Sequence, residues 1–311
     1  MTTPKLSDKQ FMDAWRETPS VAAIAKRFNL NLRQVNRRRR ALEAKYDMDL
    51  KAGANKIKIR NDPFFEYNFD NGCIIAFSDA HFWPGIYTTA FRAMIEFCKE
   101  YKPKVVSNGG DSLDGAGISD YPSINWEHIP SLKEEIEANK DCLGKIIAST
   151  PKSVFVWELG NHDQRFERTL ANRVGEYKGL EGFHLKDHFP EWKPCWTFKT
   201  NHTVFTHRFK GGEHAAYNNA IRTGRSHVTG HDHLLYHRAF RDYNGIRYGI
   251  DTGMLADTDG PQFVDYTEAN MTHWNSGFYL LTYKNGRLLS PEMIIVVDEG
   301  IVEFRGKKME V

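Results

Sequence analysis

The 311-residue sequence contains only four cysteines, at positions 73, 98, 142 and 195. None is close enough to another to form a Cys-x-x-Cys pair, which argues against a cysteine zinc site or a disulfide framework. Reduced thiols are typical of cytoplasmic proteins, so we expect a cytoplasmic location.

Long hydrophobic runs are also missing. The run from Met293 to Val297 has five residues, far short of the ~20 that a membrane helix needs. The opening MTTPKLSDKQ has no apolar core, so we do not interpret it as a signal peptide. Hydrophobic residues make up 41% and charged residues 26%, as in soluble globular proteins, and we expect no membrane partner.

Charge is distributed unevenly along the chain. Residues 1–60 contain 15 Lys and Arg against 6 Asp and Glu, whereas the remainder contains 27 against 34. A small basic segment beside an acidic body indicates two modules, and a basic module is attracted to polyanions by counterion release. A solvated basic helix without a partner has the same composition, so charge alone leaves both interpretations open.

Residues 1–50 show the periodicity of three short helices. Val21 to Phe28 has the apolar spacing of the second, and Asn31 can cap a third from Leu32 to about Tyr46. Asn29 suits the turn between them because Asn tolerates a positive φ. The residues expected on the inner face of the third helix are Leu32, Val35 and Leu42.

This stretch resembles a helix-turn-helix DNA-binding motif. Ala25, Asn29 and Val35 fall at the structural positions of that motif, with Asn in place of the more frequent Gly. The resemblance implies that the third helix enters the major groove and contacts base edges or phosphates. The candidate nucleic-acid contacts are Arg33, Gln34, Asn36, Arg37 and Arg38. A helical protein-interaction or oligomerisation module is the alternative.

Residues 51–68 contain Gly, Asn and Pro and have no helical period, which predicts a linker to a domain covering residues 69–311. In that domain predicted strands alternate with helices, so we expect an α/β fold, either an open sheet or a two-sheet sandwich flanked by helices. The predicted strands are Cys73–Ser78, Lys104–Ser107, Ser153–Glu158, Thr203–Thr206 and His227–Thr229, and the predicted helices are Tyr87–Tyr101 and Ser131–Ser149.

Polar residues follow each of these five strands. In chain order the candidate ligands are Asp79 and His81, then Asp111, Asn161, His207, and finally His231 and His233. Imidazole, carboxylate and amide oxygen suit Mn²⁺, Fe²⁺ or Zn²⁺, and the lack of a thiolate argues against a structural zinc site. A single Asp-x-His or Gly-His-x-His pair is more often the capped end of a strand than a pair of metal ligands. Five such clusters, each after a predicted strand, indicate a metal site. Two metal ions roughly 3.5–4 Å apart would polarise a phosphoryl group and supply a hydroxide to attack it.

The order Asp-x-His, Gly-Asp-x-x-Asp, Gly-Asn-His-Asp, His, Gly-His-x-His resembles the calcineurin-like metallophosphoesterase superfamily, over about 240 residues. The resemblance implies a β-sandwich core flanked by helices and a centre of two divalent ions. We expect Mn²⁺, with Fe²⁺, Zn²⁺, Ni²⁺ and Mg²⁺ as alternatives. It implies that Asp79, His81, Asp111 and His233 hold one ion. It implies that Asp111, Asn161, His207 and His231 hold the other, with Asp111 bridging.

The same resemblance implies roles for residues that do not bind metal. A metal-bridging hydroxide would attack phosphorus, His162 would protonate the leaving oxygen, and Asp163 would orient His162. Arg165 and Arg168 are candidate clamps for substrate phosphates, although pairing with nearby glutamates explains them equally well.

Two departures from the family pattern bear on the expected activity and on one of the expected metal ligands. The second block lacks the Arg of Ser/Thr protein phosphatases, and the third ends in Asp163 rather than Glu, so protein phosphatase activity is not expected. His207 is followed by Arg208 rather than the more common Gly, which leaves His202 and His214 as fallback ligands.

The leading hypothesis is a metal-dependent phosphodiesterase that hydrolyses DNA, with the helix-turn-helix module delivering the site to its substrate. A phosphatase or phosphodiesterase acting on nucleotides is the first alternative. The second is an inactive DNA-binding regulator, against which the intact Asp111, Asn161 and His162 argue. Fusion of a small helix-turn-helix to a compact enzyme is consistent with a phage gene and a location in the host cytoplasm. The oligomeric state stays open.

Overall fold

The computed structural model describes residues 6–18, 20–46, 50, 62–119, 129–264, 267–268 and 270–311. The chain divides into two compact units, Met1–Arg60 and Asn61–Val311. Across the described residues, no helix combines the length and the apolar character needed to cross a bilayer.

The first unit contains α1 (Asp8–Glu17), α2 (Val21–Arg27) and α3 (Leu32–Tyr46), and α2 and α3 are close to their predicted bounds. Asn31 begins α3 as predicted: its side-chain oxygen accepts from the N–H of Gln34 at 2.8 Å. The Gln34 side chain accepts in return from the N–H of Asn31 at 3.0 Å, which completes a reciprocal cap. Asn29 has a φ of 52°, as the predicted turn requires.

A small apolar core holds these helices together. Its buried members include Phe11, Trp15, Ile24, Val35 and Leu42. The expectation that Leu32 also faces inward was wrong: as the first residue of α3 it is 55% exposed.

The second unit contains fourteen strands among the described residues and five α-helices. The strands are β1 (Asp62–Glu66), β2 (Gly72–Phe77), β3 (Val105–Asn108), β4 (Val154–Glu158), β5 (Trp192–Thr200), β6 (Thr203–Thr206), β7 (Ser226–Thr229), β8 (Tyr236–Asp242), β9 (Gly245–Asp251), β10 (Gly277–Lys284), β11 (Arg287–Leu288), β12 (Glu292–Asp298), β13 (Ile301–Phe304) and β14 (Lys307–Glu310). The helices are α4 (Thr89–Tyr101), α5 (Leu132–Ser149), α6 (Asp163–Arg173), α7 (Leu185–His188) and α8 (Ala215–Thr223).

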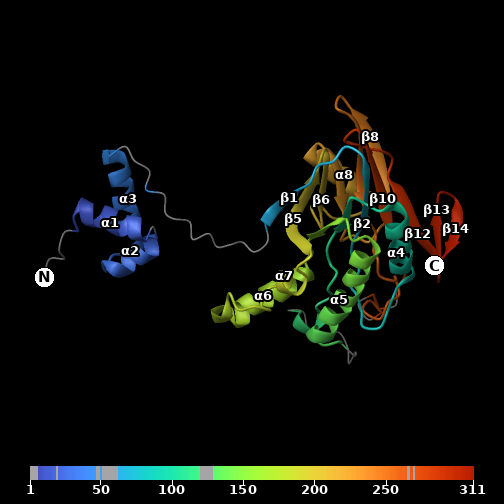
Figure 1. Ribbon diagram of the computed structural model, residues 1–311, viewed down its shortest axis with the longest axis horizontal. Helices are drawn as coiled ribbons and strands as arrows, with labels where there is room; N and C mark the ends of the chain where they lie inside the picture. Colours follow the sequence, from blue (N-terminus) through green and yellow to red (C-terminus); the bar gives the residue numbers. More distant parts are fainter. Residues whose placement is uncertain are drawn as a thin grey trace. The chain divides into compact units, whose positions relative to one another are not determined.

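These strands join in one mixed sheet (Figure 1). Twelve of them follow the order β14-β13-β12-β10-β2-β3-β4-β5-β6-β7-β9-β8, while β1 pairs with β5 and β11 pairs with β10. One apolar core lies between the sheet and α4 and α5, and includes Phe77, Phe97 and Ile146. A second core includes Ile74 of β2 and Phe205 of β6, and no helix of the described chain contributes to it. Because strands must then cover this core, the sheet folds over itself into two layers, which gives the predicted sandwich from one continuous sheet.

Strand β5 explains how the two layers share one edge. Its first half pairs parallel with β4, with Glu158 opposite Cys195, and its second half pairs antiparallel with β6, with Phe198 opposite Phe205. The carboxyl ends of β4 and β6 therefore both arrive at the middle of β5. This convergence brings the loop after β4 close to His207, which follows β6.

The predicted linker over 51–68 is too long at its carboxyl end. Residues 62–66 form β1, which pairs parallel with β5, so the second unit begins before residue 69. Residues 51–61 lie outside the described part of the chain.

Candidate metal centre

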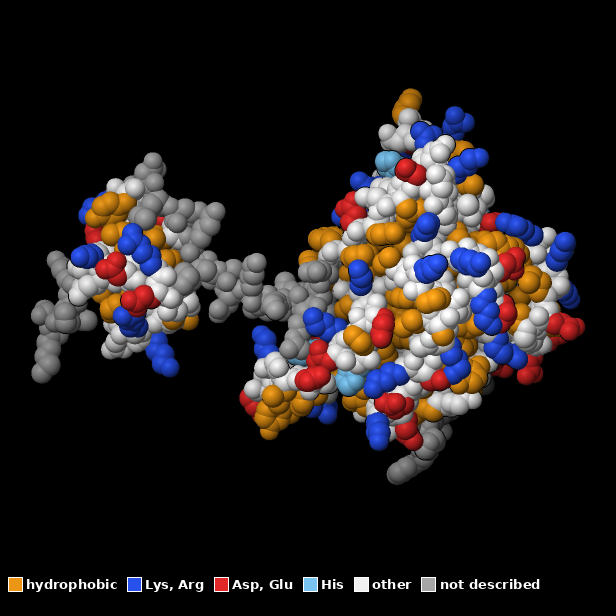
Figure 2. Space-filling view, in the orientation of Figure 1, with side chains coloured by type: hydrophobic (Ala, Val, Ile, Leu, Met, Phe, Trp, Pro, Cys, Tyr) orange, Lys and Arg blue, Asp and Glu red, His pale blue; other side chains and the backbone are white. Residues whose placement is uncertain are grey.

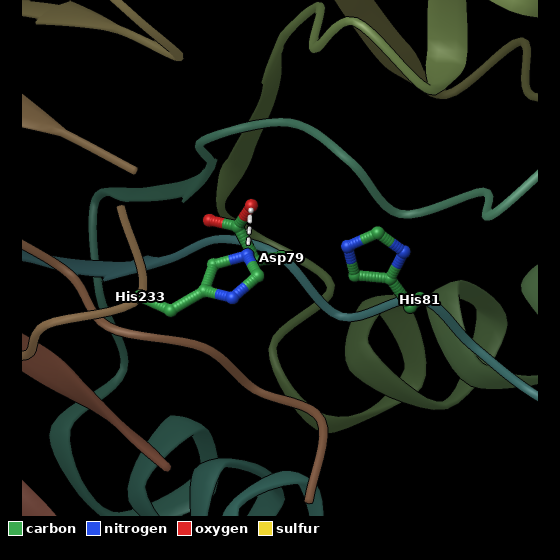
Figure 3. Close-up of side chains that lie close together, drawn as sticks. All are labelled: Asp79, His81 and His233. Carbon is green, nitrogen blue, oxygen red and sulfur yellow. Dashed lines mark hydrogen bonds and ion pairs between the residues drawn. The ribbon is translucent and has the colours of Figure 1, made fainter. Parts of the chain in front are cut away.

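The loops after β2 and β7 bring together Asp79, His81 and His233, whose candidate ligand atoms all lie within 4.8 Å of one another. His233 Nε2 is 3.1 Å from Asp79 Oδ1, and Figure 3 shows these two side chains pointing toward each other beside His81. His81 Nε2 and His233 Nδ1 are buried without a hydrogen-bond partner among the described residues. Buried polar atoms are normally paired, so these nitrogens fit ligation of a cation.

A second group consists of Asp111, His207 and His231, again within 4.8 Å. His207 Nε2 lies 3.1 Å from Asp111 Oδ2 and 3.2 Å from Asn161 Oδ1. His207 Nδ1 donates to the carbonyl of Gly109 at 2.7 Å, which leaves Nε2 free for a metal. His207 is buried, whereas both fallback residues, His202 and His214, are exposed.

The Asp111 carboxylate lies between the two groups. Its Oδ2 faces His207, and its Oδ1 accepts from the backbone N–H of His162 at 2.8 Å. Asp111 also shares a group with His81, whose ligand atoms again lie within 4.8 Å. One carboxylate within reach of both groups is the geometry that a bridging ligand requires.

Five of these residues have left-handed backbone conformations that non-glycine residues rarely adopt. Their φ angles are 52° for Asp79, 37° for His81, 52° for Asp111, 78° for His231 and 60° for His233. Each such conformation costs of the order of 1–3 kcal/mol and persists where the surroundings impose it, most often at functional sites.

The buried carboxylates of the site are stabilised in their charged form by neighbouring imidazoles. Burial alone would raise the pKa of Asp79, but the charge of His233 and its hydrogen bond lower it to about 2. The pKa of Asp111 is also lowered, because the charge of His207 outweighs burial. Burial would lower the pKa of His207, yet the charge of Asp111 raises it to about 10. Bound divalent cations would satisfy the same two carboxylates.

His162 lies beside the two groups, with its ring 4.7 Å from that of His81 and nearly perpendicular to it. Its Nδ1 donates to the carbonyl of Asp114 at 2.7 Å, and its Nε2 is 3.3 Å from Arg165 Nη2. Burial lowers the pKa of His162, but the hydrogen bond with Asp114 and the charges of Asp111 and Asp114 raise it overall. Nε2 is therefore the atom left to exchange a proton.

The expected role of Asp163 was wrong. Its two oxygens accept from the backbone N–H groups of Asp111, Ser112, Leu113 and Gly160, at 2.8–3.2 Å, and from Trp157 Nε1 at 2.9 Å. It thus ties the loops after β3 and β4 together and does not orient His162.

Asp114 is the residue that the sequence interpretation missed. Its Oδ1 is 2.9 Å from His81 Nδ1, so it fixes the ring of a candidate ligand as well as contacting His162. The sequence feature that could have identified Asp114 was its position as the second Asp of the Gly-Asp-x-x-Asp block. Phe263 was missed too; its ring lies 5.1 Å from that of His81, and no spacing pattern marks it.

The two clamp candidates differ in position. Arg165 reaches the site, where its Nη1 donates to the Asp114 carbonyl at 2.8 Å, while Arg168 lies one turn further along α6 and is exposed.

The candidate DNA contacts on α3 also differ in position, because only some of them lie on its exposed face. Arg33, Asn36 and Arg37 line a shallow surface hollow together with Arg40, which the candidate set omitted although its spacing places it on that face. The Gln34 side chain is used in the helix cap. Arg38 turns inward, where it donates to the Leu6 carbonyl and to Asp8.

The structure gathers the predicted Asp, His and Asn residues at the strand ends of one mixed sheet flanked by helices. This is the arrangement that the resemblance of the sequence to calcineurin-like metallophosphoesterases led us to expect.

Comparisons with known proteins are distant. The sequence matches no protein-family model. It is 26% identical over 239 residues to the Gene 54 protein of Mycobacterium phage L5, covering 66% of this chain and 87% of that one.

Two solved structures that resemble this chain share still less sequence with it. Vps29 from Entamoeba histolytica, complexed with zinc, is 12% identical with a TM-score of 0.40, covering 76% of this chain and 98% of that one. A dimetal phosphatase from Danio rerio is 10% identical with a TM-score of 0.37, covering 78% and 98%. Likeness of this degree does not assign an activity, which has to be argued from the site itself.

Proposed function

We propose that this protein is a phosphodiesterase that uses two divalent metal ions, Mn²⁺ first among them, to hydrolyse DNA. The observation that carries the proposal is the Asp111 carboxylate, buried within ligand distance of both groups of imidazoles and carboxylates. Asp79, His81 and His233 would hold one ion with Asp111. Asn161, His207 and His231 would hold the other.

Two divalent ions supply Lewis acidity for a phosphoryl group and a nucleophile at neutral pH. The chain supplies the rest of the chemistry. His162, held through Nδ1 by the Asp114 carbonyl, can release a proton from Nε2 to the leaving oxygen. The Arg165 guanidinium beside it places positive charge where the phosphate oxygens become more negative.

DNA is the proposed substrate because of the exposed face of α3. Arg33, Arg37 and Arg40 recur at helical spacing there, with Asn36 between them. Guanidinium groups in this pattern bind phosphates and base edges. The structure supports such a contact by leaving this face free of the apolar core.

The test uses the purified full chain with Mn²⁺ and three substrates: linear duplex DNA, single-stranded DNA and bis-p-nitrophenyl phosphate. We expect hydrolysis of DNA and of the small diester, and its loss in Asp111→Asn, which keeps the shape of the side chain but not its charge. We expect the double variant R33Q/R37Q to lose more activity on DNA than on the small diester.

Two outcomes would contradict parts of the proposal. Hydrolysis of the small diester with intact DNA would indicate a small-molecule phosphodiesterase. No hydrolysis of any of the three substrates with Mn²⁺, Fe²⁺, Zn²⁺, Ni²⁺ or Mg²⁺ would favour an inactive regulator.

A further inference from the structure

A basic and aromatic surface lies on α8 and the β8–β9 hairpin, two elements that follow the candidate ligands His207 and His233 in the chain. Residues 208–248 contain seven Lys and Arg against three Asp and Glu, although the second unit as a whole has more acidic than basic residues. Figure 2 shows Lys and Arg side chains gathered around the tip of this hairpin, at the top of the view. Positive charge is thus concentrated locally on an otherwise acidic body.

Aromatic rings lie beneath the arginines of this surface. The Arg238 guanidinium is 4.2 Å from the centre of the Tyr217 ring, and that of Arg222 is 6.0 Å from the Phe209 ring. The Phe240 ring meets Tyr217 edge-on at 5.6 Å, so α8 and β8 contribute to one cluster. We call Phe209, Tyr217, Arg222, Arg238, Phe240 and Tyr243 the arginine–aromatic surface.

Two of these rings are open to solvent. Phe209 is 48% exposed, and Tyr243, at the tip of the hairpin, is fully exposed. Exposed rings next to guanidinium groups stack on unpaired bases while the arginines contact phosphates. Bases paired in a duplex do not offer their faces in this way.

The surface is continuous with the metal centre along the chain. Phe209 comes two residues after His207, and β8 begins three residues after His233. The two connecting segments also touch, since the N–H of Gly212 donates to Asp232 Oδ1 at 3.3 Å. A strand lying on the surface would therefore run toward the candidate ligands.

Protection of a sheet edge is the competing explanation. β8 ends the sheet, and edge strands often carry charged residues that prevent pairing with another chain. That explanation accounts for Arg238 on β8. It does not account for Arg222 on α8 or for exposed Phe209.

We propose that the arginine–aromatic surface binds single-stranded nucleic acid and leads it to the metal centre. The inference rests on the proposed function, because it names the strand form that the phosphodiesterase site would receive. DNA and RNA share the phosphates and base faces that this chemistry recognises.

Binding of fluorescein-labelled 20-mers of oligo(dT), oligo(U) and a duplex, measured by fluorescence anisotropy without added metal, tests the proposal. Every protein is the full chain carrying R33Q/R37Q, so that the basic face of α3 does not dominate. We expect the further double variant R222Q/R238Q to bind at least one of the single strands about tenfold more weakly. The slope of log affinity against log salt should fall by about 1.4, for two lost phosphate contacts.

The control is K307Q/K308Q, which removes the same charge from exposed residues of β14. Equal single-strand affinity of R222Q/R238Q and this control would overturn the proposal, as would an equal loss of duplex binding. A third variant, Tyr243→Leu, removes the fully exposed ring and should weaken binding without changing the salt slope, and an unchanged affinity would also overturn the proposal. Thermal unfolding confirms that each variant folds. Hydrolysis of bis-p-nitrophenyl phosphate by wild type separates failure of this surface from failure of the metal site.

Discussion

Among single residues, Asp114 connects the two parts of the candidate site. Its carboxylate fixes the ring of His81, and its carbonyl fixes that of His162. Residues behind metal ligands set the orientation and basicity of those ligands. We therefore expect Asp114→Asn to lower metal affinity or turnover by about 10–100-fold. Mn²⁺ titration by calorimetry and hydrolysis of bis-p-nitrophenyl phosphate measure the two effects.

Asp141→Asn is the matched control for this prediction. Asp141 lies on the exposed face of α5, where its carboxylate pairs with Lys145 and Tyr87. Its replacement should change neither quantity. An Asp114→Asn protein with wild-type metal affinity and turnover would show that His81 and His162 hold their positions without this carboxylate.

The sequence predicted which candidate ligands lie close together better than it predicted the residues that support them. Each candidate ligand follows a strand, so a one-dimensional pattern was enough to place it at the strand ends. The contacts of Asp163 could not be predicted, because three of its backbone N–H partners come from a loop about fifty residues away. The inward turn of Arg38 likewise depends on Leu6 and on Asp8 of α1, which the helical spacing of α3 does not reveal.

At the scale of elements, the loops of the site depend on close backbone approach. A Cβ on Gly160, in the loop after β4, would lie 2.0 Å from Asp111 Oδ1 and 2.5 Å from the Asp111 nitrogen. We expect Gly160→Ala to displace Asp111 and to reduce Mn²⁺ binding and hydrolysis severely, even if the protein folds. Calorimetric titration and the small-diester assay detect the loss.

Gly144 provides the matched glycine control. It lies within α5, and a Cβ there would meet no atom within 4 Å. Gly144→Ala should leave metal binding unchanged and raise the free energy of unfolding by about 0.5–1 kcal/mol, because Gly disfavours a helix. If Gly160→Ala bound Mn²⁺ as tightly as Gly144→Ala, close packing of this loop would not be what positions Asp111.

Local sequence patterns predicted where the strands lie along the chain but not how the strands pair with one another. The strands β2, β3, β4, β6 and β7 are each within one residue of the predicted bounds, since buried strands appear as short apolar runs. The split pairing of β5 depends on partners distant in sequence, as does the return of β10 beside β2. The predicted sandwich therefore forms from one continuous sheet that folds over itself, and this joining could not be predicted from local patterns.

For the whole molecule, the charge asymmetry of the sequence predicted the division that the structure shows. Each unit has its own apolar core, and the boundary falls at Arg60. The central claim concerns the second unit: a single chain assembles a centre for two metal ions around one shared carboxylate.

Counting the ions tests that claim most directly. Metal-free full chain should bind two Mn²⁺ ions per chain in calorimetric titration, and Asp111→Asn should bind at most one with wild-type affinity, because both groups share Asp111. Wild type that binds one ion or none, or an Asp111→Asn protein that binds two as tightly as wild type, would contradict the dinuclear site.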